Sequence, residues 1–123
     1  MNSEIINNFI QFYIETFNNK TLIIEFSTIW KNYSTIVHNN TTFTGEQLNT
    51  YINNLYKYSI KYDSQNDVII SFMINGDRRA NILLSYIMFD LDGNYYNVSQ
   101  FILLAYSNNK EFWIHSSIFN LKI

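Results

Sequence analysis

The sequence of 123 residues contains no cysteine, no proline and only three glycines. Without cysteine the chain can form neither disulfides nor zinc–thiolate sites, and it lacks a thiol nucleophile, which is compatible with a reducing compartment. Positive charge is also scarce: the formal net charge is −2, so no nucleic-acid surface is expected. No apolar run approaches the length of a membrane span, and no signal-peptide pattern opens the chain. We therefore expect neither nucleic acid nor a membrane as a partner.

The chain is rich in apolar and aromatic residues, which make up 47% and 18% of it. Such a content excludes intrinsic disorder. A length of 123 residues is sufficient to bury one core, and no linker or repeat divides it. We predict a single domain over residues 1–123.

Residues 80–107 carry the strongest structural signal. Two long apolar runs flank the turn Asp90-Leu91-Asp92-Gly93-Asn94, whose residue types tolerate the geometry of a strand reversal. This pattern predicts a long antiparallel hairpin. Apolar residues fall on both faces of its strands, and such strands are normally covered on both sides. Each face of the sheet therefore needs a cover.

Helices are predicted early in the chain and strands late. Apolar residues at helical spacing indicate helices over residues 3–18, from Thr21 to Trp30 and over 45–56. At the start of the third helix, Thr44 and Gln47 have the spacing of a capping box. Strands are predicted over 33–38, 58–74, the two arms of the central hairpin and 112–123, with turns at 75–77 and 107–109.

This order is typical of an α+β fold in which three helices cover one face of a curved antiparallel sheet. No further segment remains to cover the second face, although its strands are apolar there too. We expect a partner subunit with a similar sheet face to cover it.

Five segments in the right order make the chain resemble the nuclear transport factor 2 family along nearly all its length. They are FIQFYIETF at 9–17, STIVHNNTTFTGEQL at 34–48, Asp63-x-Gln65, SQFILLA at 99–105 and FWIHSSIFNL at 112–121. The resemblance implies a cone with an open hydrophobic mouth, formed by three N-terminal helices packed on a strongly curved antiparallel sheet. It also implies dimerisation sheet to sheet.

Two kinds of family member set the functional expectation. One is a homodimeric import factor that carries the GDP-bound GTPase Ran and contacts Phe-Gly nucleoporins. The alternative is the small subunit that forms a heterodimer with a large mRNA exporter. Either implies a place in the cytoplasm and nucleus, at the nuclear envelope and pore. We rank the import factor first because of the acidic pair in the central turn.

The resemblance also assigns residues. Asp90 and Asp92 match two acidic positions of the mouth rim if one residue is inserted after them, while the neutral Asn39 takes the third place. Asn2 stands where the import factor has the tryptophan that contacts the pore repeats. The expected cavity lining is Trp30, His38, Phe43 and Phe119, and the expected dimer interface includes Leu103 and Ile118.

Simpler interpretations of the same residues stay open. Asp90 and Asp92 can act only as turn formers, and Arg78-Arg79 can simply solvate a hairpin tip. Relatives of this fold include isomerases and dehydratases with Asp, His or Tyr inside the cone. His38 has no carboxylate at close sequence spacing, so we expect a packing or surface histidine with an ordinary pKa. We expect no catalytic residue and no cofactor. We also expect no metal site, because Asp-x-Asp offers too few ligands.

Overall fold

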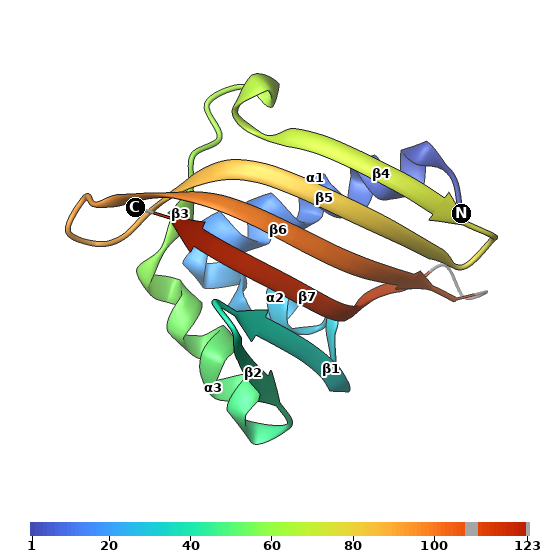
Figure 1. Cartoon of the computed structure of the whole chain (residues 1–123), viewed down its shortest axis with the longest axis horizontal. Coiled ribbons are helices and arrows are strands. Elements are labelled where there is room, and N and C mark those ends of the chain that lie inside the picture. The colour runs from blue at the N-terminus through green and yellow to red at the C-terminus, as the bar shows by residue number, and fades with distance from the viewer. Residues whose placement is uncertain (108–110, 123) are drawn as a thin grey trace.

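The computed structural model describes residues 1–107 and 111–122, which form three helices and a curved sheet (Figure 1). The helices are α1 Ser3–Asn18, α2 Ile23–Ser27 and α3 Glu46–Asn54, with short 3₁₀ turns η1 Lys20–Leu22, η2 Leu55–Lys57 and η3 Gln65–Asp67. The strands are β1 Trp30–His38, β2 Thr41–Thr44, β3 Ser59–Ile60, β4 Ile69–Asn75, β5 Arg79–Phe89, β6 Tyr95–Tyr106 and β7 Phe112–Lys122. The predicted α+β class with three helices is confirmed.

Helix α1 forms because its apolar residues recur every three or four positions and face the sheet. Its buried residues include Ile6, Phe9, Tyr13 and Phe17. The Asn2 side chain begins the helix by accepting a hydrogen bond from the Ile5 N–H at 3.0 Å. The helix ends at Asn18, as the sequence predicted.

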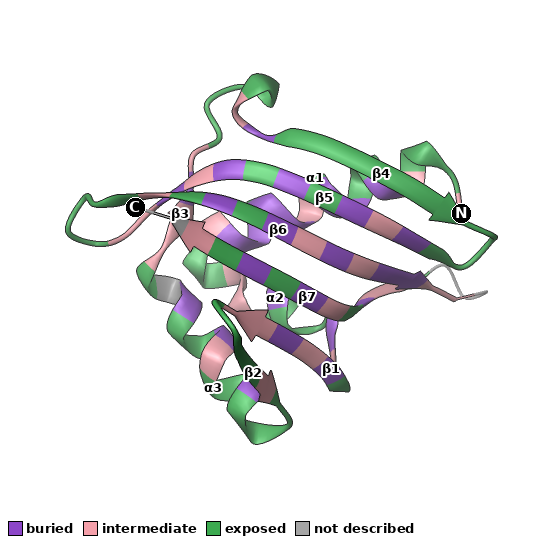
Figure 2. Ribbon diagram, viewed as in Figure 1, coloured by how far each residue is buried: buried purple, intermediate pink, exposed green. Residues whose placement is uncertain are grey.

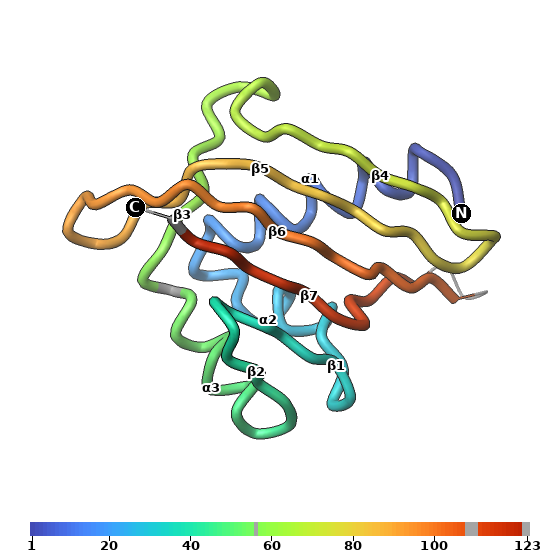
Figure 3. The backbone as a smooth tube through the Cα atoms, in the orientation of Figure 1, coloured from blue at the N-terminus to red at the C-terminus, as the bar shows by residue number. Residues whose placement is uncertain are grey.

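The described part of the chain forms a sheet of seven strands in the order β2-β1-β7-β6-β5-β3, and β4 pairs with β5 beside β3. Every neighbouring pair is antiparallel except β1 and β7, which run parallel with Val37 opposite Ile118. The sheet is therefore mixed, which corrects the prediction of a purely antiparallel one. The parallel pair arises because β1 precedes the hairpins and joins the free edge of their last strand (Figure 3).

One face of the sheet is covered by helices and the other is not. Burial alternates along β5, β6 and β7, so that one set of side chains faces the core and the other faces outward (Figure 2). We call the helix-covered side the inner face and the opposite side the outer face. The described residues contain no helix long and apolar enough to cross a membrane.

Three local predictions are wrong. The strand over 58–74 is broken into β3 and β4 by η3, because the Ser64 side chain and Asp67 form a capping box there. The second helix ends at Ser27, and Trp30 begins β1 instead. Thr44 lies in β2 and does not cap α3; its N-cap is Gly45, at φ 57° and ψ −126°, with no side-chain hydrogen bond. The predicted turn at 107–109 lies partly outside the described residues.

Candidate functional site

A cluster of aromatic side chains forms where β1, β2, α3 and β7 meet. His38 Nδ1 lies 2.6 Å from the Tyr51 hydroxyl oxygen. The Tyr51 ring packs 4.8 Å from the Phe43 ring and 6.2 Å from the Phe119 ring, measured between centroids. We call His38, Phe43, Tyr51 and Phe119 the His38–Tyr51 cluster. It contains three of the four residues predicted to line the cavity.

The fourth, Trp30, lies elsewhere. It starts β1, whereas His38 ends it, and its ring packs on Phe26 with centroids 6.2 Å apart. The Trp30 indole Nε1 is buried and has no hydrogen-bond partner among the described residues. Conversely, Tyr51 was not predicted as a site residue, because its spacing assigned it to the apolar stripe of α3.

The His38–Tyr51 pair is uncharged near neutral pH. Partial burial lowers the pKa of His38, which corrects the expectation of an ordinary value. Burial also raises the pKa of Tyr51, with smaller contributions from Tyr13 and Tyr58. Within residues 1–107 and 111–122, the polar contact of the His38 ring is this tyrosine and not a carboxylate. The pair can therefore position a neutral hydrogen-bonding group in an aromatic setting.

The Asp90 carboxylate forms hydrogen bonds within its own turn. It accepts hydrogen bonds from the backbone N–H groups of Asp92 and Asn94 and from the side chains of Asn94 and Tyr96, at 2.9–3.1 Å. Partial desolvation opposes ionisation, but these hydrogen bonds together hold the pKa of Asp90 below its usual value. Asp92 is exposed at the tip of the turn. Of the predicted acidic pair, only Asp92 thus presents an uncommitted carboxylate.

The interior of the cone holds a buried polar network that sequence reasoning missed. The Gln100 amide nitrogen donates to the Tyr13 hydroxyl and to the Ser117 hydroxyl, each at 3.0 Å. Its carbonyl oxygen accepts from the Tyr86 hydroxyl at 2.6 Å. Gln100 is fully buried, and its partners come from α1, β5 and β7. The network fills the space between helices and sheet with side chains that satisfy one another.

The outer face of the sheet carries an apolar patch. Leu83 is 55% exposed and Ile118 is 40% exposed, although both belong to long central strands. Phe101 lies directly between them in the register, and Val37 and Leu103 adjoin this row. We call these five residues, Val37, Leu83, Phe101, Leu103 and Ile118, the outer apolar patch. Both predicted interface residues, Leu103 and Ile118, belong to it.

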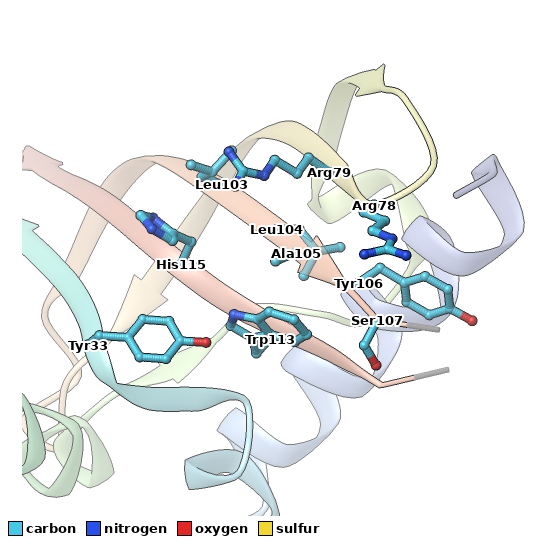
Figure 4. Close-up of a pocket in the computed structure, with 10 residues that line it drawn as sticks. All are labelled: Tyr33, Arg78, Arg79, Leu103, Leu104, Ala105, Tyr106, Ser107, Trp113 and His115. Carbon is cyan, nitrogen blue, oxygen red and sulfur yellow. The ribbon is translucent and has the colours of Figure 1, made fainter. Parts of the chain in front are cut away.

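A pocket of about 540 Å³ borders this patch at the end of β6 and the start of β7. Leu103 and Ala105 lie in its floor, while Tyr33, Trp113 and His115 stand on the side opposite Arg79 (Figure 4). The Tyr33 and His115 rings are 6.3 Å apart. Arg78 and Arg79 therefore line this pocket, beyond the predicted role of solvating a hairpin tip.

Comparison with solved structures identifies the fold. Nuclear transport factor 2 from Cryptosporidium parvum superposes with a TM-score of 0.73, at 21% identity over 97% of this chain and 93% of that one. The chain has a nuclear transport factor 2-like fold. The Mtr2 and Mex67 M-domain complex of C. albicans matches at TM-score 0.73, with 9% identity over 94% of this chain and 91% of the other. The predicted resemblance in fold is thereby confirmed.

The same fold is also found in proteins named after an enzyme. A ketosteroid isomerase-like protein from Erwinia carotovora matches at TM-score 0.72 and 11% identity, over 98% of each chain. No family model matches the sequence, and no curated protein matches it. Transport factors, an export complex and isomerase-like proteins therefore share this architecture.

Proposed function

We propose that this protein is a non-enzymatic adaptor of nucleocytoplasmic transport that works as a dimer through the outer face of its sheet. The observation that carries the proposal is the outer apolar patch, which no helix of the described chain covers. Exposed apolar residues gathered on one face are typical of a protein interface. The partner is either a second copy or the nuclear transport factor 2-like domain of an mRNA-export subunit, as in the Mtr2–Mex67 complex.

The interior supports an adaptor over an isomerase. The buried side chains of Tyr13, Tyr86 and Gln100 hydrogen-bond to one another between the helices and the sheet. A substrate would have to displace groups that already satisfy one another, which costs free energy. The outer face and not the cone interior then carries the function.

Light scattering of purified protein tests the dimer. We expect a dimer, or a complex when an export-type partner domain is added. Leu83→Lys should abolish it because the lysine charge would be buried against apolar neighbours. The matched control is Ser85→Lys, two residues along the same face of β5 and outside the patch. A wild-type protein that is monomeric at micromolar concentration and also fails to bind the partner domain would reject the proposal.

Binding of GDP-bound Ran is a second candidate, supported by the exposed Asp92. In this arrangement Asp92 pairs with a basic residue of Ran at the rim, while Asp90 keeps the turn in shape. Titration calorimetry with GDP-bound Ran of the same source should show binding that Asp92→Asn weakens. Asn39→Asp should strengthen it by restoring the third acidic position. Undetectable binding by the wild type would reject this candidate.

Binding of Phe-Gly nucleoporins is supported by a pocket of about 300 Å³ beside α1. The half-buried rings of Phe12 and Phe112 line it, with centroids 5.8 Å apart. Such an aromatic pocket suits a phenylalanine side chain. Chemical shifts of residues around Phe12 should move when a Phe-Gly repeat peptide is added, and Phe12→Ala should abolish that change. A protein with these activities would work in the cytoplasm and nucleus and at the pore, and we propose this location.

A further inference from the structure

Strand β4 is an exposed apolar edge. It pairs with β5 on one side, and within the described chain its other side pairs with no strand. All seven of its residues are exposed. The exposed fraction reaches 69% at Ile69 and 65% at Met73. Five of the seven, namely Ile69, Ile70, Phe72, Met73 and Ile74, are large apolar residues.

This edge lacks the usual protection against pairing. Natural proteins blunt an edge strand with lysine, proline or a bulge. The sequence IISFMIN contains no charged residue and no proline, and it pairs with β5 from Ile69 to Asn75 without a register shift. Because its backbone points N–H and C=O groups alternately to each side, half of them are directed outward. These groups form a ready template for another extended chain.

A groove of about 450 Å³ lies next to this edge, between α1 and the start of β4. Its floor is apolar, from Ile10 and Ile14 of α1 and Ile70 of β4, while Asn7, Gln11 and Asn66 bring carboxamides to its rim. Among the described residues, no charged side chain lines it. The groove therefore suits an uncharged side chain with an apolar stem and a hydrogen-bonding end.

We propose that the β4 edge binds an extended, uncharged peptide segment of another protein by strand addition. The segment's backbone completes the hydrogen bonds of β4, and its alternate side chains lie on the inner face beside Ile70, Phe72 and Ile74. One of these inner side chains, such as glutamine or threonine, enters the groove. This surface is separate from the outer apolar patch and does not depend on the proposed transport function.

The groove distinguishes a foreign peptide from a second copy of β4. In a symmetric pairing of two β4 strands about Phe72, Ile74 of the other copy would lie opposite Ile70. The inner residues of a second β4 are Ile70, Phe72 and Ile74, so each would bring only an apolar side chain to the carboxamide rim. The Gln11 carboxamide already donates to Glu15 at 3.1 Å. The Asn7 and Asn66 carboxamides would gain no partner from a second β4, whereas a peptide with a polar inner residue provides one.

The test is selection of binders from a displayed library of random nine-residue peptides, using the intact protein as bait. We expect uncharged sequences in which apolar residues alternate with small or polar ones. The affinity of the best synthetic peptide is then measured by fluorescence anisotropy. Met73→Lys should weaken binding at least tenfold, because it places a charge beside the added strand. Ser99→Lys is the control: Ser99 is exposed on the outer face of β6, opposite Ser85 and outside the outer apolar patch, so this variant should leave the affinity within twofold.

Two copies of the peptide, N-methylated at alternate residues, test the strand geometry. Only one set of N–H groups faces β4, so one copy should lose binding and the other should keep it. Selection that yields no peptide, equal binding by both methylated copies, or equal loss in Met73→Lys and Ser99→Lys would overturn the proposal. A wild-type dimer that Met73→Lys dissociates and Leu83→Lys does not would also overturn it, because a second copy would then occupy the edge.

Discussion

At the scale of single residues, Gln100 links three elements of the cone interior. It sits on β6 and bonds to Tyr13 on α1, Tyr86 on β5 and Ser117 on β7. One carboxamide thus satisfies three hydroxyl groups that would otherwise lie buried without partners. Gln100 contributes to stability mainly because buried hydroxyl groups without partners would cost more free energy than these hydrogen bonds provide.

Replacing this carboxamide should be strongly destabilising. Gln100→Leu keeps the volume but leaves three buried hydroxyls without their partner, and we expect a loss of about 3 kcal/mol in the free energy of unfolding. Urea denaturation followed by circular dichroism measures it. Gln47→Leu, at an exposed position of α3, is the control and should change stability little. Equal stability of the two variants would contradict the role assigned to the network.

The buried phenols should make the fold sensitive to alkali. Burial raises the pKa values of Tyr13, Tyr51 and Tyr86 above the ordinary value of 10.0. A raised pKa means that the folded chain holds these protons where the unfolded chain releases them. Their contribution to stability is therefore complete below about pH 10 and is lost as the pH rises further.

Thermal unfolding measured from pH 8 to pH 11 checks this expectation. Each buried phenol should lower the free energy of unfolding by about 1.4 kcal/mol per pH unit above pH 10. Tyr13→Phe removes one of these groups and should make the decline shallower. A melting temperature that stays constant to pH 11 would show that the phenol groups are not buried from solvent as the structure indicates.

At the scale of elements, the helix and hairpin signals were strongest where they were purely local. Helix α1 and the turn at Asp90–Asn94 follow from side-chain period and turn chemistry, and the structure contains both. The prediction of one strand over 58–74 was wrong because Ser64 and Asp67 form hydrogen bonds that interrupt the strand. The prediction that Thr44 caps α3 was wrong for a different reason. The backbone reverses at Gly45, in a conformation that only glycine adopts easily.

The start of α3 offers a direct comparison of two interpretations. If Thr44 capped the helix, Thr44→Ala would cost about 1 kcal/mol. The structure instead predicts almost no effect of Thr44→Ala. It predicts a loss of about 1–3 kcal/mol for Gly45→Ala, because a side chain strains the backbone at φ 57°. Chemical denaturation of both variants decides between the two. A larger loss from Thr44→Ala would restore the capping-box interpretation.

At the scale of the whole molecule, β7 joins the early and the late parts of the chain. It pairs in parallel with β1 and antiparallel with β6, and it contributes the buried Ile114 and Phe119 to the core. Without it, β1 and β2 have no sheet to join. The fold therefore becomes complete only when the last strand is in place.

Removal of β7 should abolish cooperative folding. We expect a chain of residues 1–107 to show no cooperative thermal transition, measured by circular dichroism, because both neighbours of β7 lose their ladder. The full-length variant Ile118→Glu is the control. Ile118 points to the outer face, so this variant should retain a cooperative transition. A cooperative transition in the truncated chain would show that β7 contributes less than its position indicates.

The sequence by itself determined the class of the fold, the first helix, the central hairpin and the apolar character of both sheet faces. These features depend on residues within a few positions of each other, whose spacing decides which way each side chain points. Only the tertiary structure decided which distant residues meet. Gln100 meets Tyr13 across 87 positions, β1 lies parallel to β7, and His38 faces Tyr51 rather than a carboxylate. It also left every residue of β4 exposed. Such contacts depend on how whole elements pack, and no local pattern records that packing.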